Sequence, residues 1–354
     1  MKRITGVYEH TGTLECFIPS PLPPQNPPLA LDKDLAFLYG QAHNLLGQLN
    51  ERFAHLQHQR GFIKACLIKE SLLSCALGNM HSTFAQALTP NYMLHTKETQ
   101  GVLHYSQALS LVITGVREQE KAIFSKLLYK AHTILLRQGQ YRLDNISLGN
   151  VWAPPATAVP ELMIKLKQYI NTNTEMLPLI KVGLVHAQFA MIRPFAQGNS
   201  RMNRMLLAAL LIKEGLLQEP ILYPSLYFKK TQRTYVACLE KVRTQGDFEG
   251  WLRYFLQGII YSAQDALRRA KDIEVLKESL VQKNLNASLL GYLFENPVVT
   301  IPEVAEKLHI TYNSANSIIQ KMVAVDILRQ TSPQKRNKAF EFTAYLDLLE
   351  QDYE

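Results

Sequence analysis

The residues with the clearest capacity for chemistry lie in one short segment, IRPFAQGNSRMNR, at positions 192–204. Gly198 can adopt backbone angles that other residues resist. Asn199 and Ser200 are residue types that favour helix N-caps. Arg201 and Arg204 are three positions apart, so they share one face of a helix that begins here. The segment therefore predicts a polar loop that opens into a helix with two arginines on one side.

A helix start of this kind is suited to anions. Its first N–H groups lack partners within the helix, and the helix dipole favours negative charge there. Two guanidinium groups beside those amides match the geometry of phosphate oxygens. We therefore expect a phosphate or polyphosphate ligand. The alternative is that the arginines pair with nearby carboxylates and that the loop only begins a helix.

The wider segment VHAQFAMIRPFAQGNSRMNRMLLAALLIKEG, at 185–215, resembles the core of the Fic (Fido-fold) family. The family motif reads His-Pro-Phe-x-Asp/Glu-Gly-Asn-Gly-Arg-x-x-Arg. PLPP and LLGQL, at 21–24 and 45–49, resemble its N-terminal helical region, and 220–259 resembles the helices after the motif. The last seventy residues resemble the winged helix often attached to Fic proteins. The resemblance implies a protein adenylyltransferase, which transfers AMP from ATP to a hydroxyl side chain of a target protein.

Matches to the motif imply roles for its residues. In the family the Asn and both Arg positions hold the nucleotide phosphates, and the Phe anchors the loop in the core. The nucleotide-binding residues implied for this chain are Phe195, Gly198, Asn199, Ser200, Arg201 and Arg204. Pro194 also matches the motif. The expected ligand is ATP or a related nucleotide.

Departures from the motif fall on the positions that do chemistry. Arg193 stands where the family has the histidine that takes a proton from the incoming hydroxyl, and a guanidinium cannot accept one. Gln197 stands where the family has the carboxylate that holds Mg²⁺; its oxygen is uncharged, so Mg²⁺ binding is expected to be weak or absent. Ser200 replaces a glycine. A positioned general base contributes about 10²–10⁴-fold, so we expect AMP transfer to be lost or greatly weakened. His186, on the preceding helix, is expected to be structural.

A second motif of the family is also altered. Many members carry an inhibitory helix with Ser/Thr-x-x-x-Glu-Gly/Asn, whose glutamate pairs with the second motif arginine. SCALGN, at 74–79, aligns with this signature. Ser74 and Asn79 match, but Gly78 takes the place of the glutamate and leaves no acid for Arg204. Gly78 and Asn79 are also expected to cap the end of a helix that spans 62–77.

Residues 138–157 break the helical pattern. Tyr141, Ile146, Val151 and Trp152, with a Gly-Asn pair between, predict a short hairpin or an irregular loop. The segment resembles the flap on which Fic enzymes dock a target, and Arg142 fits the arginine at its start. It is shortened by several residues, which weakens the expectation that a target adds a strand here.

The fold class predicted is all-α: a Fic/Fido helical core with a short β-hairpin flap, followed by a C-terminal winged helix-turn-helix. The predicted domains are an N-terminal helical region with a proline-rich arm (17–28) and a helix capped by Asp32 or Asp34, a Fido core, a linker helix and the winged helix. Their boundaries are 1–98, 99–260, 261–284 and 285–354. Core helices are expected at 104–116, 119–137, 160–172, 177–192, 201–215, 228–244 and 247–262.

In the C-terminal region, a helix from Tyr312 is expected to bury Ala315, Ile318, Ile319 and Met322. Its other face carries Asn313, Asn316, Ser317 and Gln320, which could read base edges in a DNA groove. A basic turn with Arg329, Lys335, Arg336 and Lys338 could hold phosphates. However, residues 286–354 carry six Lys or Arg against nine Asp or Glu. Protein interaction or dimerisation is therefore the alternative to DNA binding.

The composition narrows the class of protein. The chain has 354 residues, 47% of them hydrophobic, and a net charge of +8. The aliphatic run LLAALLI is too short to span a bilayer, and no secretory signal begins the sequence. We expect a cytoplasmic protein and leave open a secretion route that reads another signal. No Cys or His spacing indicates a metal site.

Three functions follow. The first is a nucleotide-binding, transfer-deficient Fic protein that acts as a ligand-responsive DNA-binding or scaffold protein. The second is an active AMP transferase, or an enzyme that removes AMP, with a non-standard site. The third is a DNA-binding regulator with an inert Fic shell. A homodimer, a protein target with a Ser, Thr or Tyr hydroxyl, and no membrane partner are expected with the first two.

Overall fold

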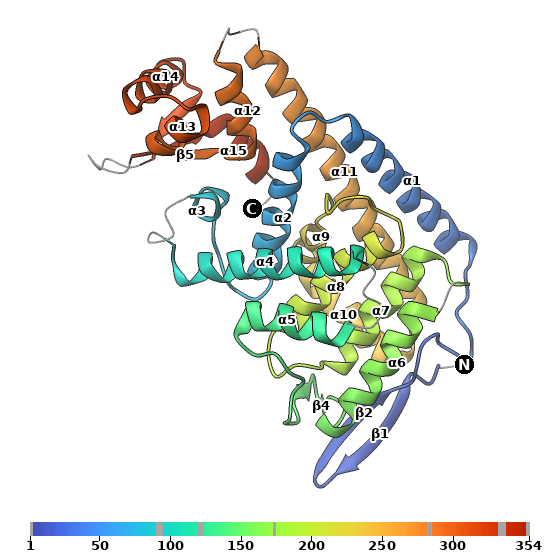
Figure 1. Ribbon diagram of the computed structural model, residues 1–354. Helices are drawn as coiled ribbons and strands as arrows, with labels where there is room; N and C mark the ends of the chain where they lie inside the picture. Colours follow the sequence, from blue (N-terminus) through green and yellow to red (C-terminus); the bar gives the residue numbers. More distant parts are fainter. Residues whose placement is uncertain are drawn as a thin grey trace.

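The computed structural model describes residues 3–89, 95–118, 124–172, 175–281, 283, 285–331 and 338–351. The described chain is predominantly helical, which confirms the predicted fold class (Figure 1). The α-helices are α1 Lys33–His55, α2 Gln59–Ala76, α3 Phe84–Leu88, α4 Lys97–Arg117, α5 Phe124–Leu136, α6 Val159–Thr172, α7 Pro178–Ile192, α8 Asn199–Lys213, α9 Ser225–Lys230, α10 Gln232–Gln245, α11 Phe248–Val281, α12 Ala287–Glu295, α13 Ile301–Leu308, α14 Tyr312–Ala324 and α15 Thr343–Glu350. A 3₁₀ turn, Ala156–Ala158, leads into α6.

Two small sheets accompany the helices. The strands are β1 Gly6–Thr11, β2 Leu14–Pro19, β3 Ser147–Leu148, β4 Val151–Trp152, β5 Val298–Thr300, β6 Leu328–Gln330 and β7 Ala339–Phe342. The predicted hairpin within 138–157 is confirmed as β3 and β4, which turn at Gly149, φ 65°. This hairpin joins an N-terminal hairpin that the sequence did not predict, in the order β1-β2-β4-β3.

The prediction of an extended proline-rich arm from residue 17 was wrong at its start. Phe17 and Pro19 belong to β2, where Phe17 is buried and the Arg243 guanidinium lies 5.8 Å from its ring centre. Phe17 and Pro19 pair with Tyr8 and Gly6 of β1, and β2 also meets β4 at Cys16. Local proline content cannot reveal these partners.

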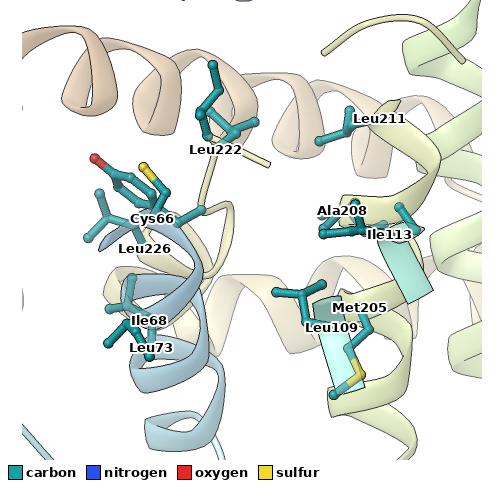
Figure 2. Packing of buried hydrophobic residues seen from close by; sticks show 14 of the residues in the cluster. Cys66, Ile68, Leu73, Leu109, Ile113, Met205, Ala208, Leu211, Leu222 and Leu226 are labelled. Atoms are coloured by element: carbon teal, nitrogen blue, oxygen red, sulfur yellow. The ribbon is translucent and has the colours of Figure 1, made fainter. Parts of the chain in front are cut away.

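The core is built from helices that contact one another across long sequence distances. Figure 2 shows Leu109 of α4 beside Met205 of α8, and Leu73 of α2 in a second group; all three are fully buried or nearly so. Helix α7 is buried on almost every face, as expected for a helix surrounded by others. Burial of one such large aliphatic side chain stabilises the fold by about 1.5–3 kcal/mol.

The helix boundaries agree with the sequence in some places and differ in others. Asp32 caps α1 by accepting a hydrogen bond from Leu35 N–H. Helix α2 ends at Leu77, and Asn79, φ 60°, takes the left-handed position that the Gly78-Asn79 pair was expected to supply. Helix α11 runs without a break through residue 260, where the sequence suggested a domain boundary.

Residues 285–351, called here the C-terminal module, contain α12, β5, α13, α14, β6, β7 and α15. Thr300 and Glu303 form a capping box at the start of α13. Ala315, Ile319 and Met322 of α14 are buried as predicted, but Ile318 is only half-buried. The final helix, α15, was not predicted.

Helix α15 docks against α11, and buried Arg269 donates to Leu348 O near its end. None of the helices in the described ranges combines the length and the apolarity that a membrane span requires.

Candidate functional site

The loop between α7 and α8, residues 193–198, has the predicted loop-to-helix form. Helix α7 ends at Arg193 (φ 47°), and Gly198 (φ 75°) is the N-cap of α8, with no side chain capping it. The expectation that Asn199 or Ser200 caps this helix was therefore wrong. A Cβ at Gly198 would lie 2.7 Å from Leu136 Cδ1, so the Leu136 side chain of α5 would have to shift to admit one.

Asn199 is the first residue of α8, and its side chain turns back into the loop. Its Oδ1 accepts a hydrogen bond from Phe195 N–H at 2.9 Å, and its Nδ2 donates to Phe195 O at 2.6 Å. Phe195 is fully buried and Asn199 is 7% exposed. The anchoring place of Phe195 agrees with the sequence interpretation. The carboxamide of Asn199 holds the loop closed from within.

His132 of α5 packs against the loop and stabilises it, and the sequence did not predict this role. Its ring stacks on Phe195 with 4.1 Å between centroids. Its Nε2 lies 3.0 Å from Gln197 O, and its Nδ1 bonds to Gln138 O. Both nitrogens thus face carbonyl oxygens, although a neutral imidazole can donate only one hydrogen bond. Burial lowers the pKa of His132. No motif around position 132 marks this histidine in the sequence.

Arg193 and Arg142 form the flap side of the site. Arg193 donates from Nη1 to Ser147 O of β3 at 3.0 Å. Buried Arg142 donates from Nε to Arg193 O at 2.8 Å, and its own N–H donates to Pro194 O at 2.9 Å. Burial, and next the charge of Arg193, lower the pKa of Arg142 to about 10. The two cations therefore lie close together and attach the flap to the start of the loop.

Arg204 and Arg201 form the opposite side. Arg204 is 3% exposed and donates from Nε to Ser74 Oγ at 2.7 Å and from Nη2 to Ser74 O at 2.8 Å. Arg201 is half-buried, with Nη1 3.7 Å from Met80 Sδ. The end of α2 thus meets Arg204, as the inhibitory-motif alignment suggested. The contact comes from Ser74, since Gly78 has no side chain to offer.

Glu70, one helical turn before Ser74, is a buried acid that the sequence analysis overlooked. It accepts hydrogen bonds from Ser225 N–H at 3.1 Å, from Ser225 Oγ at 2.6 Å and from Tyr105 OH at 3.4 Å. Burial raises the pKa of Glu70 to about 7, against the opposing effects of the Ser225 hydrogen bonds and of Arg204. The sequence signal that could have revealed this buried acid was its place among the leucines and the isoleucine of LIKESLL.

The site as a whole is cationic. Within the described part of the chain, none of Arg142, Arg193, Arg201 and Arg204 forms an ion pair with a carboxylate. No ion pair among the described residues therefore supports the alternative, in which the loop arginines pair with carboxylates. The side chains of Gln197 and Ser200 are exposed, so the rim of the loop is open.

The residues of the loop do not fit a Mg²⁺ site. Gln197 offers only a neutral carboxamide, and no group of three His, Cys, Asp or Glu side chains within the described ranges could hold a metal ion. Mg²⁺ prefers charged oxygen ligands.

His186 is embedded in the core behind the loop. Its Nε2 lies 2.7 Å from Tyr235 OH, and its ring stacks on Trp251 with 5.5 Å between centroids. Burial lowers its pKa to about 3. A fully buried neutral ring has a structural role, in agreement with the sequence interpretation.

The second candidate surface lies on α14. Asn313, Ser317 and Gln320 are exposed, and Asn316 is half-buried with its Oδ1 3.4 Å from Gln320 Nε2. In the basic turn, Lys338 is half-buried, while Lys335 and Arg336 lie outside the described residues. Arg329 is 3.4 Å from Glu341, so part of its charge is neutralised.

Comparison with known proteins connects the loop to a family. Residues 122–211 match the sequence model of the Fic/DOC family. The chain is 22% identical to "Protein adenylyltransferase Fic" of Drosophila virilis over 202 residues, which are 56% of this chain and 39% of that protein. It is 23% identical to the Drosophila ananassae protein of the same name over 150 residues, 42% of this chain and 28% of that protein. The chain thus matches well under half the length of these relatives.

Solved structures share the fold. A Fic family protein from Desulfovibrio desulfuricans aligns with a TM-score of 0.59 and 19% identity over 90% of this chain and 98% of that one. A fragment of Fic-1 from C. elegans aligns with a TM-score of 0.52 and 16% identity over 69% and 74% of the two chains.

Proposed function

We propose, from the premise that the chain carries a Fic/Fido domain, that this domain binds a nucleotide or another phosphate ligand and has lost most of its AMP-transfer activity. The phosphate would lie at the uncapped start of α8, beside Arg201. Arg193 would supply further positive charge from the flap side. Helix N-termini and guanidinium groups together stabilise phosphate charge.

The observation that carries the proposal is the lack of a proton acceptor at the loop within the described residues. Arg193 stays protonated, and Gln197 is not basic. His132 is the imidazole that contacts the loop, but each of its nitrogens faces a carbonyl oxygen of the protein. A target hydroxyl would therefore attack without general-base assistance, which contributes about 10²–10⁴-fold in enzymes that have it.

Arg204 and Asn199 take a secondary part in this proposal. Both are engaged with the protein itself, Arg204 with Ser74 and Asn199 with Phe195. Arg204 can reach a ligand only by giving up a contact with the end of α2. We therefore assign the first contact to Arg201 and to the amides at the start of α8.

Transfer is tested with α-labelled ATP and Mg²⁺. The wild-type protein should label neither itself nor candidate targets, whereas Arg193→His combined with Gln197→Glu should raise labelling. Strong wild-type labelling that disappears in Arg201→Ala would overturn the proposal in favour of an active transferase. The Arg201→Ala variant must keep the wild-type circular dichroism spectrum.

Ligand binding is tested by calorimetry with ATP, ADP and AMP. We expect binding that weakens from ATP to AMP, because fewer phosphates meet the arginines, and that weakens in Arg201→Ala. Absence of binding at millimolar ligand would instead support an inert Fic shell.

A second function, DNA binding, rests on α14. The order α12-β5-α13-α14-β6-β7 supports a winged helix-turn-helix, and α14 exposes Asn313, Ser317 and Gln320. A gel shift should weaken when Lys335 and Arg336 are changed to Glu, and its dependence on salt should flatten. An unchanged gel shift would instead indicate that the C-terminal module binds a protein, which its excess of acidic residues favours. Light scattering would then test for a homodimer.

A further inference from the structure

A cavity of about 490 Å³ lies where the C-terminal module meets the helical core. We call it the junction pocket. One wall comes from the turn between α1 and α2 and from the last turns of α11, and the other comes from α12 and α15. In Figure 1 these elements meet in the upper part of the molecule, away from α7. The volume of the junction pocket is within the range of about 300–1,000 Å³ that is usual for small-molecule sites.

The floor of the junction pocket is apolar and partly aromatic. Phe62, Phe294 and Tyr345 contribute rings, and the rings of Phe294 and Tyr345 meet edge to face at 5.1 Å. All three residues are at most 5% exposed, so their positions are set by the core. A flat apolar group would contact aromatic edges and faces there.

One wall of the pocket is held in an unusual conformation. His58 has φ 62°, which non-glycine residues adopt only when their surroundings enforce it. Its ring stacks on Phe294 at 5.8 Å and 8°, and a Cβ added at Gly291 would lie 3.1 Å from its Cε1. The pocket is thus largely preformed, which reduces the entropy lost when a ligand binds.

The charged side chains around the pocket differ in how well they are paired. Glu274 pairs with Arg52 at 3.1 Å, and His55 with Glu51 at 2.8 Å, while Glu278 is exposed. Half-buried Lys277 donates to the neutral carboxamide of Gln57 and forms no ion pair with a carboxylate of the described residues. Burial lowers the pKa of Lys277 against the opposing charge of Glu274, and burial and Lys277 lower the pKa of His58 against the opposing charge of Glu295. An anionic group beside the Lys277 ammonium would compensate for its partial burial.

We propose that the junction pocket binds a small molecule with a flat apolar body and a single anionic group, the body on Phe62, Phe294 and Tyr345 and the anion on Lys277. Because its walls belong to both the core and the C-terminal module, such a ligand would hold the two together. The site is separate from the loop that follows α7 and does not depend on the function proposed for it.

The test uses the full chain and three probes of one shape: 2-naphthoate, 2-naphthalenemethanol and 2-naphthylmethylammonium. Calorimetry should show 2-naphthoate binding at one site, at least about tenfold tighter than the neutral and cationic probes. Lys277→Gln should weaken 2-naphthoate by about tenfold, the loss expected for one charge-assisted hydrogen bond, and leave the neutral probe unchanged. Lys241→Gln, at an exposed position of α10, is the matched control.

Hydrogen exchange locates the ligand. Bound 2-naphthoate should slow exchange in α12, in α15 and at the end of α11. Equal affinity for the three probes, an unchanged affinity in Lys277→Gln, or protection confined to other helices would each overturn the proposal. So would a lack of 2-naphthoate binding at millimolar concentration.

Discussion

The loop at 193–198 and the helix α14 both present polar side chains, but the two regions are built differently. In the loop, buried groups hold the backbone from within: Asn199 bonds Phe195, and His132 bonds Gln197. On α14 the polar side chains of Asn313 and Ser317 point to solvent, and the buried residues beside them are apolar. Buried polar side chains thus stabilise the loop at 193–198, whereas the exposed polar side chains of α14 contribute little to stability.

This difference shows where a change in function would also change stability. A loop held by a buried polar network loses stability when one member is removed, because the partners stay buried without hydrogen bonds. An exposed helix face can change its residues at little cost. The exposed face of α14 can therefore vary at little cost in stability, while the loop must keep its buried supports even where its exposed residues change.

The largest effect is expected from Gly198→Ala. Gly198 has φ 75°, and an added Cβ would lie 2.7 Å from Leu136 Cδ1. The left-handed conformation costs about 1–2 kcal/mol for alanine and overpacking about 1–3 kcal/mol. We expect a loss of about 2–5 kcal/mol in the free energy of unfolding, measured by urea denaturation. Gly215→Ala is the matched control, because Gly215 has φ 71° but nothing within 4 Å of its added Cβ. Equal losses in the two variants would show that α5 does not press on the loop.

The next effect concerns Glu70 and pH. Its pKa is raised from 4.5 to about 7 in the folded protein. Between these pH values the folded state keeps a proton that the unfolded state releases, so stability falls as pH rises through this window. One unit of pKa corresponds to about 1.4 kcal/mol, so the loss approaches about 3 kcal/mol by pH 8.

Glu70→Gln should remove this dependence. Urea denaturation from pH 4 to 8 should show the stability of wild type, relative to the variant, falling with pH. The opposite trend from His186, whose pKa is lowered to about 3, is present in both proteins and cancels in the difference. Glu306→Gln, at an exposed position, is the control. A constant difference between wild type and Glu70→Gln would contradict the raised pKa.

Local patterns in the sequence predicted the loop, its arginines and the anchor Phe195, but not the buried supports His132 and Glu70. The glycine, the arginines and the turn of 149–150 were visible because helix starts and hairpin turns depend on neighbouring residues. His132 and Glu70 were not, because their roles come from contacts with residues 65 and 155 positions away. The N-terminal hairpin was missed although β1 and β2 are neighbours in the sequence; only its contact with β4, at Cys16 and Trp152, is long-range.

Asn199→Ala should have a smaller effect than the glycine substitution. It removes two hydrogen bonds and leaves the N–H and C=O of Phe195 buried without these partners. The expected loss is about 2 kcal/mol by urea denaturation. Ser200→Ala, one position further and exposed, should change stability by less than about 0.5 kcal/mol. If both variants unfold at the same urea concentration, the loop is not held by Asn199.

The smallest effect is expected on α14, and it tests the other half of the comparison. Asn313→Ala combined with Ser317→Ala removes two exposed side chains and adds a better helix former at each position. Stability should change by no more than about 0.5 kcal/mol, while any DNA or protein partner of this face should bind more weakly. A loss as large as that of Asn199→Ala would mean that the polar face of α14 is packed. The polar face of α14 would then stabilise the fold, as the loop does, and exposure would no longer argue that its residues bind a partner.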